Sequence, residues 1–259
     1  GRKKERTFIM EALKKFDIKH LSASSISLFI NDPASWIVSY IYKKPFKSSA
    51  SAERGKFIEK GLNQILGNYQ NWETTIKEQI HLYTETCKEM KIPQEEYEQE
   101  YHFIKKALEI LPPHFSKFGK IISYQKRIGY NYKGVPIIGY IDFEFDKHII
   151  VDLKTSSKMN VSINHKIAQH IYKTATNMEN KLFYVQVLKT KENVMEYQLT
   201  DEDNIKIPLL IHQAIENMNY LCGIATSKKD FTRLITPNPD NWLWKDEDKI
   251  KARKEIWGF

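Results

Sequence analysis

The sequence predicts an α/β protein whose core of strands and helices carries a helical elaboration on its N-terminal side. Three observations support this fold class. Apolar residues recur at helical spacing through roughly the first 115 residues. The pattern then changes to the alternation and β-branched composition of strands over 121–155. A helix, a strand pair and a long helix follow in turn, as expected for an α/β core.

The N-terminal part contains helical patterns separated by turn and loop residues. The first begins at Ser22, a favourable N-cap, and Asp32-Pro33 interrupts it. Pro112-Pro113 is expected to end the last of them. The patterns cover 22–41, 53–67, 73–91 and 95–111, with a loop at 43–52.

The strands follow as an antiparallel meander in which Lys133-Gly134 makes the first turn. The predicted strands of the meander are 121–132, 135–145 and 149–155. The remaining elements are a helix at 163–178, strands at 182–188 and 194–199, and a helix at 201–222 that Thr200 or Asp201 caps.

Composition indicates a packed protein of moderately basic charge. The 259 residues include 40 Lys and Arg against 32 Asp and Glu, a net charge of +8, and 41% are hydrophobic, which excludes a disordered chain. Two cysteines, Cys87 and Cys222, are too few for a disulfide scaffold or a four-cysteine metal site. No apolar run approaches the ~20 residues of a membrane helix, and no leader peptide is evident. We therefore expect a soluble, reduced, cytoplasmic protein that does not contact a membrane.

The hairpin made by the second and third strands carries the clearest chemistry. Side chains alternate between faces along a strand, so Asp152 and Lys154 point the same way. If Asp146-Lys147-His148 forms a three-residue loop, Asp142 lies opposite Asp152, whereas a two-residue loop would place the aspartates on opposite faces. The other face is apolar and is expected in the core, namely Ile141, Phe143, Phe145, Ile149, Val151 and Leu153.

Two carboxylates about 5 Å apart repel each other unless a cation lies between them. Hard oxygen ligands suit Mg²⁺ or Mn²⁺, and a metal ion there could activate a water molecule beside a phosphate. Lys154 could orient the nucleophile or stabilise the negative charge of the transition state. The alternative is an amphipathic hairpin whose solvent face carries Asp, Glu and Lys side chains without a function.

These residues resemble the PD-(D/E)XK nuclease superfamily, and in particular its RecB-like branch. Four segments occur in the order that the family shows, between residue 21 and about residue 175. They are Leu21-Ser22-Ala23-Ser24-Ser25-Ile26, Arg54-Gly55-Lys56-Phe57-Ile58-Glu59, the hairpin motifs Gly139-Tyr140-Ile141-Asp142 and Val151-Asp152-Leu153-Lys154-Thr155, and Gln169-His170-Ile171-Tyr172.

The resemblance implies a restriction-endonuclease-like core, a mixed central sheet flanked by helices. It implies that Asp142, Asp152 and the main chain near Leu153 bind Mg²⁺, for which Mn²⁺ can substitute, and that Lys154 acts at the attacking water. Glu59 stands where many RecB-like members have a metal-binding histidine, and is expected as a further ligand and catalytic side chain. The iron–sulfur cluster of some members is excluded. Its first cysteine precedes a proline in those members, and at that place this sequence has Asp32 before Pro33.

Several polar residues are candidate nucleic-acid contacts. Gln169 and Tyr172 are neighbours on one face of a helix, although the family usually spaces this pair by four residues. Basic residues before Glu59 could lead a nucleic-acid backbone into the site. They are Lys43, Lys44, Lys47 and Arg54. Three tryptophans in the tail, Trp242, Trp244 and Trp257, could stack on single-stranded bases, but docking of the tail onto the domain is the preferred interpretation.

The resemblance implies a Mg²⁺-dependent deoxyribonuclease, with an exonuclease of recombination, repair or phage DNA metabolism as the leading hypothesis. An endonuclease or a non-catalytic nucleic-acid-binding module of the same fold is the alternative. One domain over 1–259 is expected, with a helical part at 1–115, a catalytic core at 116–225 and a tail at 226–259. DNA is the expected partner, and recombination or replication proteins are further candidates. The expected location is a bacterial cytoplasm or a phage-infected host cell.

Overall fold

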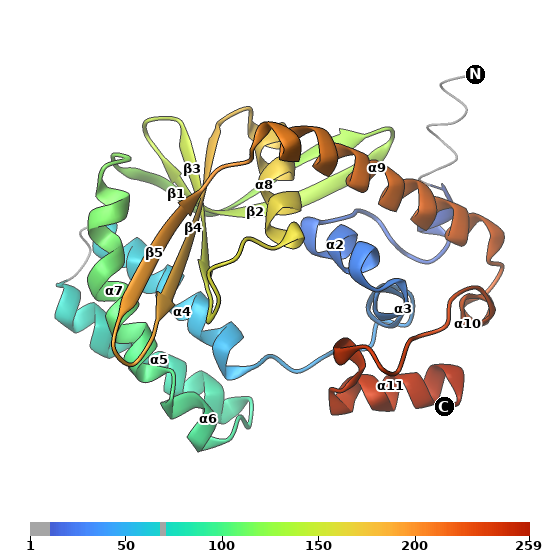
Figure 1. Cartoon of the computed structure of the whole chain (residues 1–259), viewed down its shortest axis with the longest axis horizontal. Coiled ribbons are helices and arrows are strands. Elements are labelled where there is room, and N and C mark those ends of the chain that lie inside the picture. Colours follow the sequence, from blue (N-terminus) through green and yellow to red (C-terminus); the bar gives the residue numbers. More distant parts are fainter. Residues whose placement is uncertain (1–10, 68–70) are drawn as a thin grey trace.

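A mixed five-stranded sheet forms the centre of the protein (Figure 1). The computed structural model describes residues 11–67 and 71–259; the start of the chain, where no leader peptide is expected, lies outside them. The strands are β1 (Ile121–Tyr132), β2 (Val135–Phe145), β3 (Ile149–Thr155), β4 (Glu179–Val187) and β5 (Glu192–Tyr197), in that order across the sheet. Only β3 and β4 pair in parallel, because helix α8 (Ile163–Thr176) connects them.

The turns set the register of the meander. Lys133 and Gly134 both have positive φ, 48° and 94°, and pair Tyr132 with Val135 as a two-residue hairpin turn does. At the other end, the three-residue loop 146–148 pairs Phe145 with Ile149. The predicted boundaries of these three strands are confirmed, and of the two loop lengths considered the structure has the three-residue loop.

One face of the sheet is covered by helices of the N-terminal part. Helices α4 (Ala50–Leu66) and α7 (Tyr101–Ser116) contact the strands, and α5 (Trp72–Glu89) and α6 (Gln94–Glu98) pack on these two helices. Phe115 of α7 lies at the centre of the interface, with its ring centroid 4.8 Å from that of Phe183 and 5.7 Å from that of Phe143. Aromatic edges and faces at such distances bury a large apolar area, so α7 holds this layer on the sheet.

The prediction that Pro112-Pro113 ends its helix is wrong, because α7 continues to Ser116. Proline has a φ that a helix accepts, but it has no backbone N–H to donate to the preceding turn. The completely buried side chains of Leu111 and Phe115 lie before and after the prolines, and their packing carries the helix through them. Helix α4 also begins earlier than predicted, since Ser49 caps it in place of a start at Glu53.

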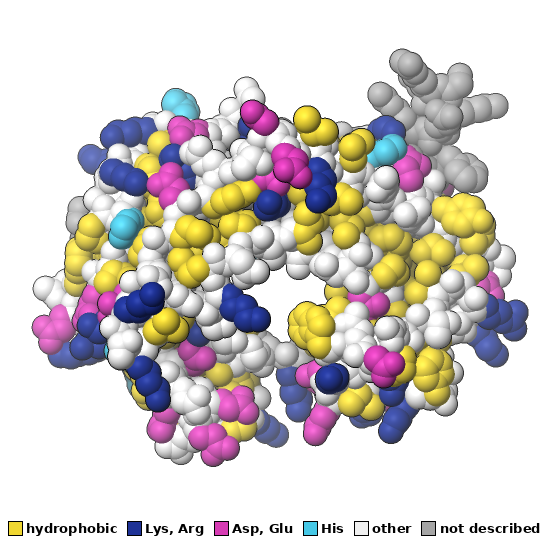
Figure 2. All heavy atoms as spheres, in the orientation of Figure 1, with side chains coloured by type: hydrophobic (Ala, Val, Ile, Leu, Met, Phe, Trp, Pro, Cys, Tyr) yellow, Lys and Arg dark blue, Asp and Glu magenta, His cyan; other side chains and the backbone are white. Residues whose placement is uncertain are grey.

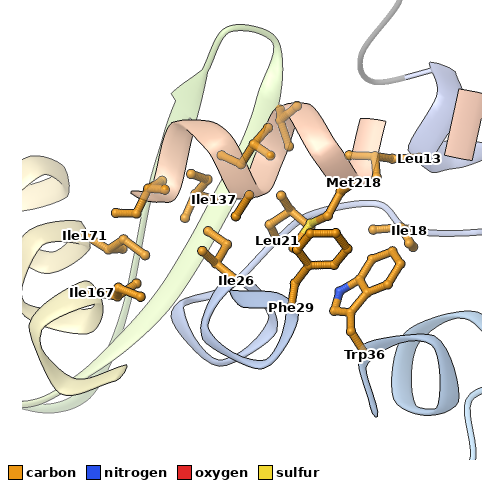
Figure 3. Close-up of a cluster of buried hydrophobic side chains, with 14 of the residues drawn as sticks. Leu13, Ile18, Leu21, Ile26, Phe29, Trp36, Ile137, Ile167, Ile171 and Met218 are labelled. Atoms are coloured by element: carbon orange, nitrogen blue, oxygen red, sulfur yellow. The ribbon is translucent and has the colours of Figure 1, made fainter. Parts of the chain in front are cut away.

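The opposite face of the sheet packs against α2 (Ala23–Asn31), α8 and α9 (Asp201–Ile224). Figure 3 shows their shared cluster, in which Ile26 of α2, Ile171 of α8 and Met218 of α9 converge near Ile137 of β2. Ser22 caps α2 as predicted, accepting a hydrogen bond from the backbone of Ser25 at 3.1 Å. The helical layers on both faces make the fold an α/β sandwich around the sheet.

The C-terminal segment docks onto the helices that follow α2, which are α3 (Pro33–Trp36) and the π-helical turn η1 (Ile37–Ile41). The segment contains η2 (Lys228–Asp230), α10 (Phe231–Leu234), η3 (Trp242–Trp244) and α11 (Glu247–Trp257). Trp244 is 1% exposed and packs with Ala34, Val38 and Ala252. The expected docking of the tail is therefore confirmed for Trp244, whereas Trp242 remains 76% exposed.

The two helical groups project from the sheet like two lobes, with α4 to α7 in one and α3, α10 and α11 in the other (Figure 1). The segment 42–49 runs from η1 to α4 and joins them. Figure 2 shows an opening between the lobes, bordered by the sheet. None of the helices within the described ranges is both long enough and apolar enough to cross a membrane.

Candidate active site

The predicted aspartates come together at the edge of the β2–β3 ladder. The last ladder pair is Phe143 with Val151, and Asp142 and Asp152 follow it. Instead of another ladder bond, Oδ2 of Asp142 accepts the backbone N–H of Leu153 at 2.8 Å. Asp142 is 6% exposed and Asp152 only 1%. The alternative of a solvent-exposed polar face is therefore wrong for both carboxylates.

Lys154 lies beside Asp152, with 2.9 Å between Nζ and Oδ1. Burial favours the neutral amine, but Asp152 and Asp142 outweigh it and hold the pKa of Lys154 above its usual value. The side chain is consequently an ammonium group at neutral pH. It can donate hydrogen bonds and neutralise charge, but it cannot accept a proton.

The second oxygen of Asp152 is a candidate metal ligand. Oδ2 is buried and has no hydrogen-bond partner among the described residues. Burial, together with the neighbouring Asp152, raises the pKa of Asp142 well above its ordinary value. An unpartnered carboxylate oxygen in this acidic pair fits a divalent cation, because Mg²⁺ prefers hard oxygen ligands. Leu153 is 2% exposed, with its side chain in the core, so only its main chain can contribute.

Glu59 reaches the same region from helix α4. Gly55 allows the helix to approach the end of β3, since a Cβ atom at that position would lie 3.2 Å from Oγ1 of Thr155. Burial raises the pKa of Glu59 to about 7; Lys154 opposes this shift and Asp152 adds to it. The carboxyl group therefore titrates near neutral pH, which suits proton transfer.

Gln125 of β1 links Glu59 to Asp142, although the predicted site did not include it. Its Nε2 donates to Oε2 of Glu59 at 3.0 Å and to Oδ1 of Asp142 at 3.1 Å. Gln125 could have been found from the turn at Lys133-Gly134. A register that pairs Tyr132 with Val135 also places Gln125 opposite Asp142.

The strand pair is irregular at Gln125, whose φ is +51°. Neither Gln125 nor Asp142 takes part in the ladder. Ile141 packs in the cluster under α8, whereas Phe143 packs in the cluster under α7. The predicted single apolar face that included Ile141 is therefore wrong, because the irregularity re-aims the side chains on either side of it.

The candidate metal ligands do not form a compact centre of three carboxylates. No three His, Cys, Asp or Glu side chains of the part that the structure describes lie close enough together to hold a metal ion. The amide of Gln125 bonds to both Glu59 and Asp142. The residues present thus fit a metal ion held by Asp142, Asp152 and the main chain at Leu153, with Glu59 near it rather than within its ligand cluster.

Two cavities meet at Lys154. The larger, about 930 Å³, runs between α2, α8, β2 and η3. The smaller, about 280 Å³, lies along the start of α4 and is lined by Glu59 and by Leu153 of β3. A substrate in either cavity would therefore reach the ammonium group.

The predicted basic contacts take different places. Arg54 is 7% exposed and forms an ion pair with Glu100 at 2.7 Å. Its guanidinium also stacks on Phe103, 3.8 Å from the ring centroid. Arg54 therefore stabilises the position of α4 rather than presenting a free cation. Lys43 and Lys44 form ion pairs with Asp17 and Glu255 respectively. Lys47 is exposed on the segment that joins the lobes.

Gln169 and Tyr172 are separated by the structure. Gln169 is 1% exposed and lines a different cavity, of about 130 Å³, between α8 and β4. Its amide has no partner within the described ranges. Tyr172 lines the large cavity with Lys154. Only Tyr172 is therefore placed where it could contact a substrate in that cavity.

We predict that Gly139→Ala disturbs the position of Tyr172. A Cβ atom at residue 139 would lie 2.8 Å from Cε1 of Tyr172. Overpacking of this kind lowers the free energy of unfolding by about 1–3 kcal/mol. Urea unfolding measures it, with Gly223→Ala as the control: the new methyl group there meets no described atom within 4 Å and removes a flexible glycine from α9. Equal unfolding free energies in the two variants would contradict the prediction.

Comparisons with known proteins concern the family and the fold of this chain. Residues 20–233 match the family model of the PD-(D/E)XK nuclease superfamily. The structure of a Eubacterium rectale protein provisionally described as an exonuclease resembles this one, with a TM-score of 0.50, 13% identity, and coverage of 80% of this chain and 82% of that chain. The structure of SSO0001 shows a TM-score of 0.32 and 15% identity, over 69% of this chain and 90% of that one. A search of curated proteins found no match.

Proposed function

Because this chain belongs to the PD-(D/E)XK nuclease superfamily, we propose that it is a metal-dependent deoxyribonuclease that hydrolyses phosphodiester bonds. One observation carries the proposal. Asp142, Asp152 and Lys154 are brought together beside a large cavity, and Oδ2 of Asp152 is buried without a hydrogen-bond partner among the described residues. Acidic and ammonium groups in this arrangement can hold a divalent cation and a phosphate side by side.

A bound Mg²⁺ or Mn²⁺ would polarise the phosphate and lower the pKa of a water molecule. Asp142 and Asp152 would hold it, with the main chain at Leu153. Lys154, protonated next to Asp152, would donate to the phosphate oxygens on which negative charge develops. Glu59, whose pKa is about 7, could take a proton from the attacking water. Gln125 would orient Glu59 and Asp142.

Within this activity, we propose an exonuclease of the RecB-like branch. The description of the Eubacterium rectale protein supports it, and the opening between the two lobes is suited to a strand that enters by its end. Recombination, repair and phage DNA metabolism are processes that need such an activity. An endonuclease of the same fold is the alternative function.

Digestion of two forms of one plasmid separates these functions. We expect the enzyme with Mg²⁺ to degrade linearised plasmid to small products and to leave the covalently closed circle intact for the same time. Excess EDTA should abolish degradation, and Mn²⁺ added to a concentration above that of the EDTA should restore it. Cleavage of both forms at the same rate would identify an endonuclease, and no Mg²⁺-dependent cleavage of either would exclude the proposed activity.

A further inference from the structure

The large cavity is built differently from a surface that binds duplex DNA. Its lining contains serines, asparagines and aromatic side chains; among the described residues, Lys154 is its one lysine or arginine and no aspartate or glutamate takes part. Duplex binding depends on several lysines and arginines that contact phosphates. The wall of this cavity instead offers hydrogen-bonding groups and ring faces, which recognise bases.

Two large aromatic side chains on this wall are unusually exposed. Trp242 of η3 is 76% exposed and Tyr140 of β2 is 53% exposed. Both line the cavity whose wall also includes Lys154. A single exposed aromatic residue is ordinary, but two in the cavity that reaches the candidate active site are available to a ligand there.

The fold holds Trp242 in place although its ring is free. Two residues later, Trp244 is buried against Ala34 and Val38 and anchors the turn. Oδ1 of Asn241 accepts the backbone N–H of Leu243 at 3.0 Å and caps η3. Because the backbone on both sides is fixed, Trp242 loses little conformational freedom when a ligand stacks on it.

We propose that Trp242, together with Tyr140, forms a stacking subsite for the bases of single-stranded DNA that leads to Lys154. This rests on the proposed nuclease function and specifies its substrate. Stacking requires bases whose faces are accessible, and a duplex keeps its base faces covered. The absence of carboxylates from the described lining lets the strand's phosphates pass the wall without repulsion. The remaining tail tryptophans serve docking, as the buried Trp244 shows.

The subsite is tested by binding without cleavage. Fluorescence anisotropy with a fluorescein-labelled 20-nucleotide oligodeoxythymidylate, in EDTA and low salt, gives Kd for wild type, Trp242→Ala and Trp242→Phe. We expect Trp242→Ala to raise Kd roughly 5- to 150-fold and Trp242→Phe to retain most of the affinity. Trp72→Ala, at a tryptophan 45% exposed at the start of α5, is the matched control and should leave Kd unchanged. Circular dichroism verifies that each variant is folded.

An abasic strand of the same length isolates the bases from the phosphates. Wild type should bind it no more tightly than Trp242→Ala binds the thymidylate, because the abasic strand cannot stack on Trp242 or on Tyr140, and the substitution should cause no further loss. Wild-type affinity of Trp242→Ala for the thymidylate, or an equal loss on the abasic strand, would overturn the stacking subsite.

Digestion assays separate failure of the stacking subsite from failure of the proposed nuclease activity. If wild type cleaves single strands with Mg²⁺ and Trp242→Ala has the same KM and kcat, the nuclease stands and the subsite fails. If Trp242→Ala loses binding while wild type cleaves no DNA, the subsite stands and the nuclease activity fails. We expect a raised KM on single strands with kcat nearly unchanged.

Discussion

Asp152→Asn is expected to reduce Mg²⁺-dependent DNA hydrolysis by at least about a thousandfold. The substitution keeps the shape of a side chain that is 1% exposed, so the fold should remain. It removes the charge that faces the ammonium group of Lys154 at 2.9 Å, and it removes the carboxylate whose Oδ2 has no partner within the described ranges. Both the metal ion and Lys154 would then lose the group that positions them.

Initial rates on end-labelled DNA measure this effect, and calorimetry with Mn²⁺ measures metal binding separately. Asp240→Asn is the matched control, because Asp240 is exposed in the C-terminal segment and its backbone N–H, not its carboxylate, takes part in the local turn. It should behave as wild type. Hydrolysis by Asp152→Asn within tenfold of wild type would exclude the proposed role of Asp152.

Asp142→Asn is expected to abolish hydrolysis to a similar extent while it stabilises the metal-free protein. Burial and the charge of Asp152 raise the pKa of Asp142 well above its ordinary value. A buried charge of the same sign as its neighbour destabilises the fold. An amide in its place keeps an oxygen that can accept the N–H of Leu153, and only the hydrogen bond that Gln125 donates to the other oxygen is lost. We expect the thermal midpoint at pH 8 in EDTA to rise by about 2–6 °C.

The dependence on pH follows from the direction of the shift. A carboxyl group whose pKa is raised by folding binds protons more tightly in the folded state, so stability is lost as pH rises toward the raised value. For Glu59 this window lies between 4.5 and about 7. Without metal, wild type should lose thermal stability as pH rises from 4.5 to 8. Asp142→Asn should lose less, and Asp142→Asn with Glu59→Gln should lose least.

Differential scanning fluorimetry in EDTA measures these curves. The same titration with Asp240→Asn should follow wild type. Parallel curves for wild type and Asp142→Asn over the whole range would show that Asp142 does not carry a raised pKa. A midpoint lowered by Asp142→Asn at pH 8 would show that its carboxylate stabilises the fold.

Much of the fold was predictable because local signals agree with it. The strands of the meander match their predicted bounds, since turn residues with positive φ mark their ends. The predicted superfamily is confirmed by the match over residues 20–233. The α7 prolines were misread because the packing of Phe115, a long-range contact with β2 and β4, outweighs the local preference of proline.

The site was predicted in part for the same reason. Asp142, Asp152 and Lys154 share a hairpin, so alternation and loop length placed them together. Arg54 looked like a phosphate contact because its charge is visible in the sequence, but its partner Glu100 lies 46 residues away. Gln125 was overlooked because an uncharged amide gives no sign of a role in the sequence. Its role is visible only when its two acceptors, Glu59 and Asp142, are known.

The sequence by itself determined the three strands of the meander and the motif that identifies the superfamily, because these depend on side-chain alternation, turn residues and short spacings. Only the tertiary structure decided which groups are buried and what they face. It packed Trp244 against η1 and left Trp242 exposed, and it placed Gln169 and Tyr172 of one helix in the walls of two different cavities. The physical reason is that burial and charge pairing arise between elements distant in the chain, where no local pattern specifies the partner.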